Sequence, residues 1–385
     1  MIIKTRDSQL ADWIAMVVIC LMAVGTVFIF SAGANLGQQL NIRRFYDFPS
    51  LRQLLFFPLA VSIMYTVSCI NYRRLSADKG WLKSPAGYLL VISLTLLVLV
   101  LIFGTEINQS RRWLRMHAGP AIISFQPSEL AKWAIVLFLA AYGDKYKAEL
   151  NLYRRRFVPA CAVVALTAGL IISEDFGTAA FILLIGLLIL ITAGARLRHI
   201  ATLLPFAVIG FCGVLLRSPG RLLRIAAFFN PKKWADSAAY QANQSLIALG
   251  SGGMFGKGLG GGICKYGHLP EDTTDFIFAI IGEELGFVGT AAVIGLFVVF
   301  VWVGILVVVR CRDSFGRLLA GGIVLAIGIQ AVINIGVVTV VLPTKGIPLP
   351  FVSSGGTSML LSAAAVGILM NVAKQSYKGA LEADE

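Results

Sequence analysis

The chain has 385 residues, of which 57% are hydrophobic and only 14% are charged. A water-soluble protein of this size carries far more charge on its surface, so the composition excludes a globular domain that folds in water. The formal net charge is +13, but the basic residues lie in short segments between apolar runs. That distribution is typical of membrane proteins and argues against nucleic acid as a partner. We therefore expect membrane lipid to surround most of the chain.

Apolar runs of about 20 residues, the length that crosses a hydrocarbon core about 30 Å thick, recur from one end of the sequence to the other. They predict an all-α, polytopic integral membrane protein in which residues 1–385 form one bundle of about ten transmembrane helices. The first run lacks a small-residue cleavage pattern, so we expect it to be retained as a helix. The predicted spans are 13–31, 51–70, 86–104, 126–142, 157–173, 176–194, 199–216, 276–309, 317–341 and 356–373.

The distribution of basic residues predicts the orientation of this bundle. Ten spans put both termini on one side. With the N-terminus inside, the short inner segments hold about 18 Lys and Arg residues and the short outer loops about seven. Segment 217–275 carries seven more, but long loops follow this rule poorly. We therefore predict cytoplasmic termini and a large extracytoplasmic loop at 217–275.

Charged residues interrupt the apolar pattern at two places. The span 126–142 carries Lys132 one turn inside, where a cation costs about 2.5–3.5 kcal/mol on insertion scales unless a partner or water is near. We predict that Lys132 faces a polar cavity. Asp175 lies at a tight outer turn between two spans, where capping of the following helix and a functional role are both open.

The run 276–309 has 34 residues, about 51 Å at 1.5 Å per residue, which exceeds the membrane thickness. It must break, tilt or protrude, and the natural break points are Gly282, Gly286 and Gly289.

The stretch 250–262 is rich in glycine, but Lys257 is followed by Gly258 rather than Ser or Thr. A flexible surface loop is therefore favoured over a phosphate loop. The six cysteines include no CxxC pair, which indicates neither a disulfide framework nor a zinc site.

Acidic residues are scarce, and a quarter of the twenty in the chain fall within fourteen residues: Glu271, Asp272, Asp275, Glu283 and Glu284. Pro270 suits the first position of a helix, and acids in the first turn complement the helix dipole. That explains Asp272 and, in part, Glu271. Asp275 lies a turn further in, directly before an apolar stretch, where the dipole favours it little and desolvation threatens it. Asp275 is therefore the better candidate for a working base.

Basic residues complement these acids in two other outer segments. Arg111, Arg112 and Arg115 lie in 105–125, and Lys345 lies in the final outer loop, LPTKGIPLPFVSSGGTS. An anionic ligand at the outer face would meet these groups, although loop arginines also bind lipid phosphates. The prolines and glycines of the final loop are typical of non-helical backbone that lines a cavity.

Four segments together resemble the signature motifs of the SEDS family, named for shape, elongation, division and sporulation: QPSELAK (126–132), EDFGTA (174–179), LPEDTTDFIFAIIGEELGF (269–287) and LPTKGIPLPFVSSGGTSML (342–360). The resemblance covers nearly the whole chain, in order. The LPTKG spelling is more similar to the FtsW and SpoVE branch than to RodA. Two departures are Glu174, where the family usually has Pro, and Ser354, where it usually has Tyr.

The resemblance implies a peptidoglycan glycosyltransferase of cell division that polymerises lipid II at the outer face of the bacterial cytoplasmic membrane. It implies a class B penicillin-binding protein and other cell-division proteins as partners. Asp275 aligns with the family's essential aspartate and is expected to be the general base. We expect substrate contacts at Arg111, Lys132, Asp175, Glu271, Lys345 and Ser353.

Three questions stay open at this stage. A divalent cation, Mg or Mn, is a candidate cofactor that no motif fixes. A lipid II flippase or other transporter is the alternative function, because broken helices and intramembrane charge suit it equally. A non-catalytic division scaffold is a third reading, and the sequence does not separate division from elongation or sporulation.

Overall fold

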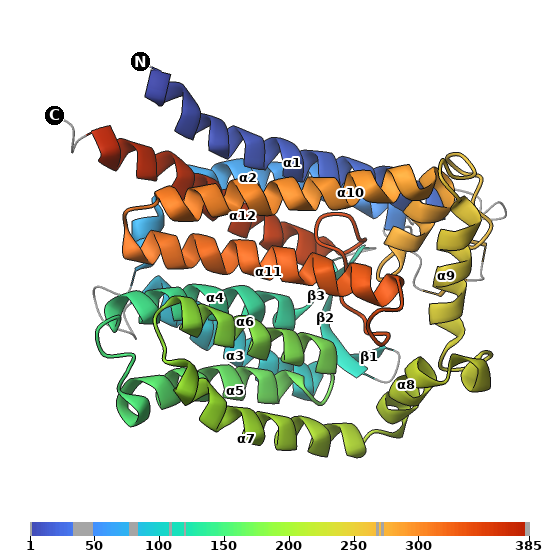
Figure 1. Cartoon of the computed structure of the whole chain (residues 1–385), viewed down its shortest axis with the longest axis horizontal. Coiled ribbons are helices and arrows are strands. Elements are labelled where there is room, and N and C mark those ends of the chain that lie inside the picture. Colours follow the sequence, from blue (N-terminus) through green and yellow to red (C-terminus); the bar gives the residue numbers. More distant parts are fainter. Residues whose placement is uncertain are drawn as a thin grey trace.

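The structure is a computed structural model that describes residues 2–33, 49–76, 84–107, 110–118, 121–266, 269–270 and 273–381. The long helices of the described chain run side by side as a bundle (Figure 1). The two termini lie at the same end of this bundle. The helices of the bundle are α1 (Ile2–Gly33), α2 (Pro49–Ser68), α3 (Pro85–Phe103), α4 (Pro127–Lys145), α5 (Val158–Ile171), α6 (Phe176–Thr192), α7 (Leu197–Leu216), α10 (Ile277–Arg310), α11 (Ser314–Val338) and α12 (Gly356–Leu381).

Helix starts are fixed by local chemistry. The Ser84 hydroxyl accepts a hydrogen bond from the Gly87 N–H, and Pro85 occupies the first helical position of α3. Asp313 caps α11 in the same way, accepting from the Gly316 N–H. Such caps satisfy backbone donors that have no partner within the helix, and they fix the residue at which these two helices begin.

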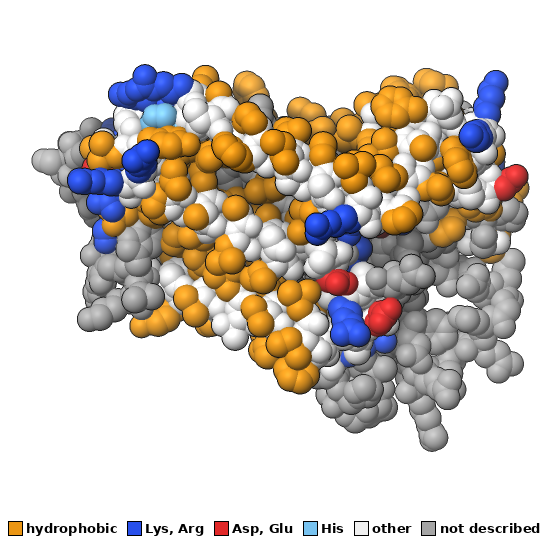
Figure 2. Space-filling view, turned by 90° about the horizontal axis from the view of Figure 1, so that it is seen from below, with side chains coloured by type: hydrophobic (Ala, Val, Ile, Leu, Met, Phe, Trp, Pro, Cys, Tyr) orange, Lys and Arg blue, Asp and Glu red, His pale blue; other side chains and the backbone are white. Residues whose placement is uncertain are grey.

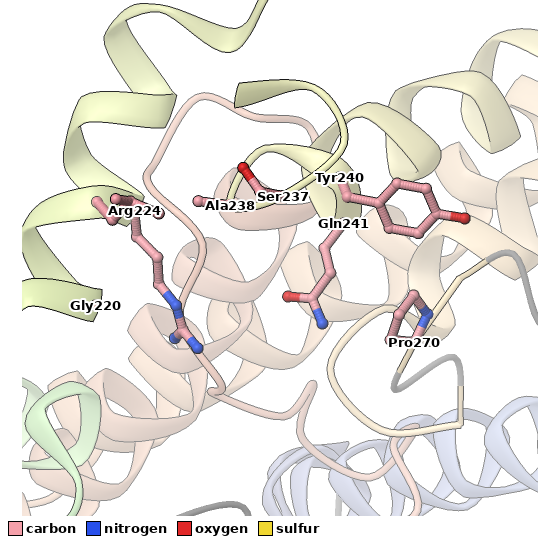
Figure 3. A pocket seen from close by; sticks show the side chains of 8 residues that line it. Gly220, Arg224, Ser237, Ala238, Tyr240, Gln241 and Pro270 are labelled. Atoms are coloured by element: carbon pink, nitrogen blue, oxygen red, sulfur yellow. The ribbon is translucent and has the colours of Figure 1, made fainter. Parts of the chain in front are cut away.

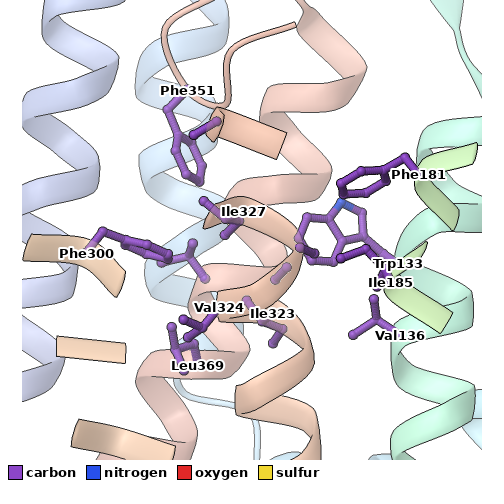
Figure 4. Packing of buried hydrophobic residues seen from close by; sticks show 14 of the residues in the cluster. Trp133, Val136, Phe181, Ile185, Phe300, Ile323, Val324, Ile327, Phe351 and Leu369 are labelled. Carbon is purple, nitrogen blue, oxygen red and sulfur yellow. The ribbon is translucent and has the colours of Figure 1, made fainter. Parts of the chain in front are cut away.

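The bundle core lies where α4, α6, α10, α11 and α12 meet. Figure 4 shows Trp133 of α4 beside Phe181 of α6, with Ile327 of α11 between them and Phe300 of α10. Helix α4 is buried around nearly its whole circumference. A helix that is apolar on all sides belongs at the centre of a bundle, and α4 therefore sits where it can support residues on several neighbours.

A helix lies in each of the ten predicted ranges, although α1 begins earlier and α12 ends later than predicted. In the described residues, seven helices are long and apolar enough to cross a membrane by themselves: α1, α2, α3, α7, α10, α11 and α12. Figure 2 shows hydrophobic side chains over the middle of one face, with cationic groups at one end and mixed charges toward the other. The multi-span helical class is confirmed, while the number and direction of crossings stay predictions.

The end opposite the termini carries structure that the sequence analysis missed. Three short antiparallel strands follow α3: β1 (Thr105–Ile107), β2 (Ser110–Ala118) and β3 (Ala121–Phe125). In this sheet Glu106 pairs with Arg111, and Leu114 pairs with Phe125. Segment 217–275 is also more than a loop, because it contains α8 (Pro219–Phe229), a short 3-10 turn η5 (Pro231–Trp234) and α9 (Tyr240–Gly252).

Helix α10 breaks at Gly286, whose backbone lies at φ 67° and ψ −159°, outside the helical region. A positive φ favours glycine because a Cβ would clash there. The prediction of a break in the 34-residue run is confirmed at one of its three candidate glycines. Asp275 lies two residues before the half-helix 277–285 that precedes the break.

Candidate active site

Asp275 lies at the entrance to α10, pressed against the loop 342–355. The Asn334 amide of α11 donates hydrogen bonds to the backbone carbonyls of Asp275 and Ile347, both at 2.8 Å. The Asp275 Oδ2 atom lies only 2.8 Å from where a Cβ on Gly346 would be. The carboxylate is therefore placed by a helix and a loop that meet from distant parts of the sequence.

Ser353 holds the loop 342–355 to the residues before α10. Its hydroxyl donates to the Thr274 carbonyl at 2.6 Å and accepts from the Leu349 N–H at 2.8 Å. The Ser354 N–H donates to the Thr273 carbonyl at 2.9 Å. Ser353 is 4% exposed and its hydroxyl already serves two backbone groups. In this arrangement it positions the backbone around Asp275, and its role as a substrate contact stays a prediction.

Lys132 of α4 is 2% exposed and lies against protein partners rather than in an open cavity. Its Nζ atom is 2.8 Å from Glu129 Oε2 and 2.9 Å from Gln330 Oε1. Gln330 in turn donates to the Pro348 carbonyl at 2.9 Å. The prediction of a polar cavity is therefore wrong for this arrangement: the partner that the buried cation needs comes from the protein itself. Lys132 is thereby linked to the loop 342–355.

Asp175 caps α6, accepting a hydrogen bond from the Thr178 N–H at 3.0 Å, so the capping alternative is confirmed. Its other carboxylate oxygen is 3.6 Å from Arg112 Nη1. The Arg112 Nε also donates to the Glu174 carbonyl at 2.9 Å. The α5–α6 turn is thus fastened to β2, and a substrate contact by Asp175 stays a prediction.

Arg111 and Arg112 are neighbours on β2, and successive side chains of a strand point to opposite faces. The Arg111 guanidinium is exposed and 3.9 Å from Glu106, whereas Arg112 is the one that reaches the α5–α6 turn. The Arg111 backbone N–H donates to the Glu174 carboxylate at 2.6 Å. Glu174, the residue that departs from the family pattern, therefore anchors the sheet. Arg111, Arg112 and Arg115 were all expected near an anionic ligand, and the specific substrate contact was assigned to Arg111 with no strand predicted to separate the faces of the two neighbours.

Two cations flank the ring of Phe176 at the start of α6. Lys345 Nζ lies 5.0 Å from the ring centroid, and Arg221 of α8 lies 5.2 Å from it. Burial lowers the pKa of Lys345, with nearby Asp175 opposing the shift. Burial likewise lowers the pKa of Arg221, and Arg112 adds to that effect. The sequence analysis missed Arg221, although the RLLR spacing of 221–224 on an apolar segment could have indicated an amphipathic helix.

Glu283 and Glu284, on the half-helix of α10, form a buried clasp with segment 252–266. Both are 0% exposed. Lys257 Nζ is 2.8 Å from Glu283, and Lys265 Nζ is 2.8 Å from Glu284, which also accepts from the Ser31 hydroxyl of α1 at 2.7 Å. Backbone N–H groups of the segment bind the same carboxylates. The glycine-rich stretch 250–262, predicted to be a flexible surface loop, is therefore held against α10 at its break.

Two further predictions receive no test from this geometry. Glu271 lies outside the described residues. Among the residues that are described, no group of three or more His, Cys, Asp or Glu side chains could hold a metal ion. The expectation of Mg or Mn therefore stays a prediction.

The bundle and its polar end define a multi-span helical membrane protein in which a carboxylate, several cations and a proline-rich loop converge at one end. Residues 11–378 match the FtsW, RodA and SpoVE family, described as "Cell cycle protein". The chain therefore belongs to this family, and the resemblance drawn from its motifs is confirmed.

Relatives of known name agree over nearly the whole chain. Stage V sporulation protein E of Bacillus subtilis is 39% identical over 371 residues, which cover 94% of this chain and 96% of the relative. The probable peptidoglycan glycosyltransferase FtsW of Coxiella burnetii is 36% identical over 370 residues, with 94% and 96% covered.

Solved structures share the fold. A chain from the structure described as "Structural coordination of polymerization and crosslinking by a peptidoglycan synthase complex" has a TM-score of 0.74 and 25% identity, and covers 95% of this chain and 98% of its own length. The Rod shape determining protein RodA of Thermus thermophilus has a TM-score of 0.66 and 25% identity, with 94% and 96% covered.

Proposed function

We propose that this protein is a peptidoglycan glycosyltransferase that polymerises lipid II, with Asp275 as the general base. The observation that carries the proposal is the placement of Asp275 at the start of α10: Asn334 of α11 binds its backbone carbonyl, and its carboxylate lies against Gly346 of the loop 342–355. Cations gather at the same end of the bundle, on β2, α8 and this loop. The names of the FtsW relatives support the same activity.

The proposed reaction joins two lipid-linked saccharides. The 4-hydroxyl of an acceptor GlcNAc attacks the anomeric carbon of the donor MurNAc and inverts it. Asp275 takes the hydroxyl proton as the new C–O bond forms, and the lipid diphosphate leaves with the electron pair of the broken bond. A sugar hydroxyl is a weak nucleophile, and a positioned base contributes about 10²–10⁴-fold. Diphosphate leaves without a proton, so no second, acidic carboxylate is needed.

The diphosphate leaving group gains negative charge in the transition state, and fixed cations stabilise that charge. Arg112, Arg221 and Lys345 are the cations that lie around the α5–α6 turn. Arg111 and Lys132 are proposed as further contacts to the anionic substrate. A divalent ion, Mg or Mn, would add to this charge, and its requirement is tested by chelation.

The predicted topology agrees with this placement. Helix α10 begins just after Asp275, its start lies at the end of the bundle opposite the termini (Figure 1), and cytoplasmic termini would put that end at the outer face. A class B penicillin-binding protein is proposed as the partner that crosslinks the strands, within a division complex. The chain's longest segment between bundle helices, 217–275, is too short to hold a transpeptidase domain. Cysteine labelling at Ser237 and Ser376 in intact cells tests the orientation, and outside reactivity at Ser376 alone contradicts it.

Polymerisation of labelled lipid II by the purified chain, with and without its partner, is the decisive experiment. We expect uncrosslinked glycan strands from the chain alone, in low yield, and more when the partner shifts the outer elements toward a competent arrangement. Absence of polymer in both preparations would refute the proposal.

A lipid II flippase is the second candidate and makes a different demand on the structure. It needs polar groups through the full membrane depth. Among the described residues, the buried acids and lysines of the bundle helices are Glu129, Lys132, Glu283 and Glu284, all within the first two or three turns of α4 or α10 at one end. The one-sided placement of these charges favours the enzyme, while buried neutral polar side chains such as Ser93, Thr167 and Asn371 also lie in other parts of the bundle. A non-catalytic scaffold predicts normal function without the Asp275 carboxylate.

A further inference from the structure

A cavity of about 390 Å³ lies between α8 and α9, apart from the residues assigned above. Its walls are Gly220, Leu223, Arg224, Ser237, Ala238, Tyr240, Gln241 and Pro270. Figure 3 shows the side chains of Arg224 and Gln241 extending into the same space, with Pro270 beside them. A volume of this size is in the range of small-molecule and saccharide sites.

The polar side chains of this cavity have unused hydrogen-bonding capacity. Among the described residues, Arg224 and the Gln241 amide have no hydrogen-bond or ion-pair partner in the protein. The charged neighbour of Arg224 is Arg221, another cation, whose pKa is lowered by burial and by nearby arginines. Asp175 and Glu174 are also near Arg221 and oppose that shift, whereas the exposed Arg224 has no carboxylate partner among the described residues.

The three walls of the cavity, which are α8, α9 and Pro270, are each linked to the candidate active site. Arg221 joins α8 to the α5–α6 turn, since its Nη2 donates to the Ser173 carbonyl at 2.7 Å. Helix α9 is tied to α11, since the Ser245 hydroxyl donates to the Val338 carbonyl at 2.7 Å. The third wall, Pro270, precedes Asp275 by five residues. A ligand in the cavity would therefore lie beside elements that already position the proposed base.

The lining chemistry selects the class of ligand. A guanidinium and a carboxamide together present several N–H donors to one oxyanion, and an arginine can hold a carboxylate or phosphate through two of them. Ser237 and Tyr240 also line the cavity, but Figure 3 shows their hydroxyls pointing away from the Arg224 guanidinium and the Gln241 amide, so the oxyanion would rest on the latter two groups.

We infer that the cavity is a second substrate subsite, in which Arg224 and Gln241 bind an oxyanion carried by one of the two saccharide substrates. This inference rests on the proposed polymerase function. A polymerase must hold donor and acceptor together, and both are anionic. The oxyanion is either a carboxylate on the saccharide portion or a phosphate of the lipid carrier, and both use the same donors.

Steady-state polymerisation by the purified full chain with its partner tests the role of Arg224. Arg224→Gln removes the charge and shortens the side chain while keeping an N–H donor, and we expect it to raise KM for the lipid-linked substrate about tenfold at unchanged kcat. Tenfold corresponds to about 1.4 kcal/mol, the lower end of the range for hydrogen bonds to charged groups. Gln241→Leu should raise KM in the same direction. Arg217→Gln, on an exposed arginine at the end of α7 that does not line the cavity, is the matched control and should behave as wild type.

Binding measurements on the same preparations identify the oxyanion. One ligand is a soluble saccharide-peptide without the lipid diphosphate, and the other is a short prenyl diphosphate without the saccharide. If Arg224→Gln lowers the affinity about tenfold for the saccharide-peptide alone, the oxyanion is a carboxylate. If it lowers the affinity for the prenyl diphosphate alone, the oxyanion is a phosphate. Either result supports the subsite. Unchanged affinity for both ligands together with an unchanged KM overturns it.

The proposed polymerase function and the proposed subsite can be refuted separately. If the wild-type chain and its partner make no polymer, the proposed function fails, and the binding measurements still report on the cavity. If wild type polymerises and Arg224→Gln matches it in KM and in binding, the subsite alone is refuted.

Discussion

Helices α4 and α7 have nearly the same length, 19 and 20 residues, yet they occupy opposite environments. Helix α4 is buried on nearly every side and carries the Glu129–Lys132 pair. Helix α7 exposes Leu197, Phe206 and Ile209 at 69%, 73% and 69%. The buried helix carries charge, and the exposed helix is the more apolar one.

This inversion is what a bilayer produces. Lipid tails are as apolar as leucine, so an exposed apolar face is stable there, while a charge is tolerated only inside the protein with a partner. In this molecule a buried charge therefore marks a position that supports function. We expect substitutions near the end of α4 that faces Asp275 to have large effects, and substitutions on α7 to have small ones.

The largest effect is expected at Asp275. Asp275→Asn is nearly isosteric but cannot accept the hydroxyl proton, so polymerisation should fall by about 10²–10⁴-fold, even with the partner bound. Glycan synthesis from labelled lipid II is the measurement, and Asp236→Asn, on an exposed acid between η5 and α9, is a matched control that should retain activity. Substantial synthesis by the Asp275 variant would refute both the base and the location of the site.

The buried pair on α4 should show the next largest effect. Lys132→Met leaves the Glu129 carboxylate buried without its partner, which costs about 3–5 kcal/mol in comparable cases. The variant should melt at a lower temperature and lose activity. Adding Glu129→Gln removes the stranded charge, so the double variant should regain stability while activity stays low if Lys132 also contacts substrate. Normal polymerisation by the Lys132→Met protein would show that the lysine does not contact substrate, and a lowered melting temperature in that protein would leave it a structural role only.

How far the sequence could predict these features depends on the distance along the chain between partners. The apolar runs give every helix of the bundle, because each run determines its own helix. The Glu129–Lys132 pair is three residues apart and thus readable on one helix face. Gln330 accepts a further hydrogen bond from Lys132 but lies 198 residues away in the chain, so no local sequence pattern predicts this contact.

The same limit explains the errors in outer segments. Asp275 was identified because a carboxylate before an apolar run is anomalous by itself. Strand β2 was not predicted, so the opposite directions of Arg111 and Arg112 could not be foreseen, and the substrate contact at Arg111 stays a prediction. The order of stretch 250–262 depends on Glu283 and Glu284, which lie beyond it in the chain and bind it only in the folded protein.

Gly346 offers a test of positioning without removing any functional group. A Cβ at this residue would approach Asp275 Oδ2 to 2.8 Å, so Gly346→Ala should move the carboxylate by a few tenths of an ångström or more. Misplacement by about 1 Å can reduce rate by about 10²-fold, and we expect a smaller loss in kcat with little change in melting temperature. Gly355→Ala, in the same loop with ordinary contacts at that position, is the control. Equal activity of both variants would mean that the carboxylate is not held against the loop during catalysis.

Lys345 should give a more modest signature in the pH dependence. Burial lowers its pKa, so the folded protein releases this proton at a lower pH than the unfolded chain. Between the two pKa values the unfolded state binds more protons, and the contribution of Lys345 to stability rises with pH in that window. Its charge, and with it anion binding, is lost over the same window. KM of the wild type should therefore increase on the alkaline side, and Lys345→Arg should shift that increase to higher pH; an identical profile would remove Lys345 from the substrate contacts.

The smallest effect is expected on α7. Ile209 is 69% exposed, whereas Ile135 on α4 is 1% exposed. Ile135→Ala opens a cavity among packed side chains and should cost about 2–5 kcal/mol, while at Ile209 lipid fills the space that alanine leaves, so Ile209→Ala should stay within about 0.5 kcal/mol of wild type. Shifts in melting temperature of the purified protein, compared for the two variants, give the measurement. If lipid or detergent covers Ile209, as the apolar surface of α7 predicts, the contrast isolates protein packing from the hydrophobic effect. A loss at Ile209 that matches the loss at Ile135 would mean that α7 is covered by another protein segment, and adding the partner should then enlarge that loss.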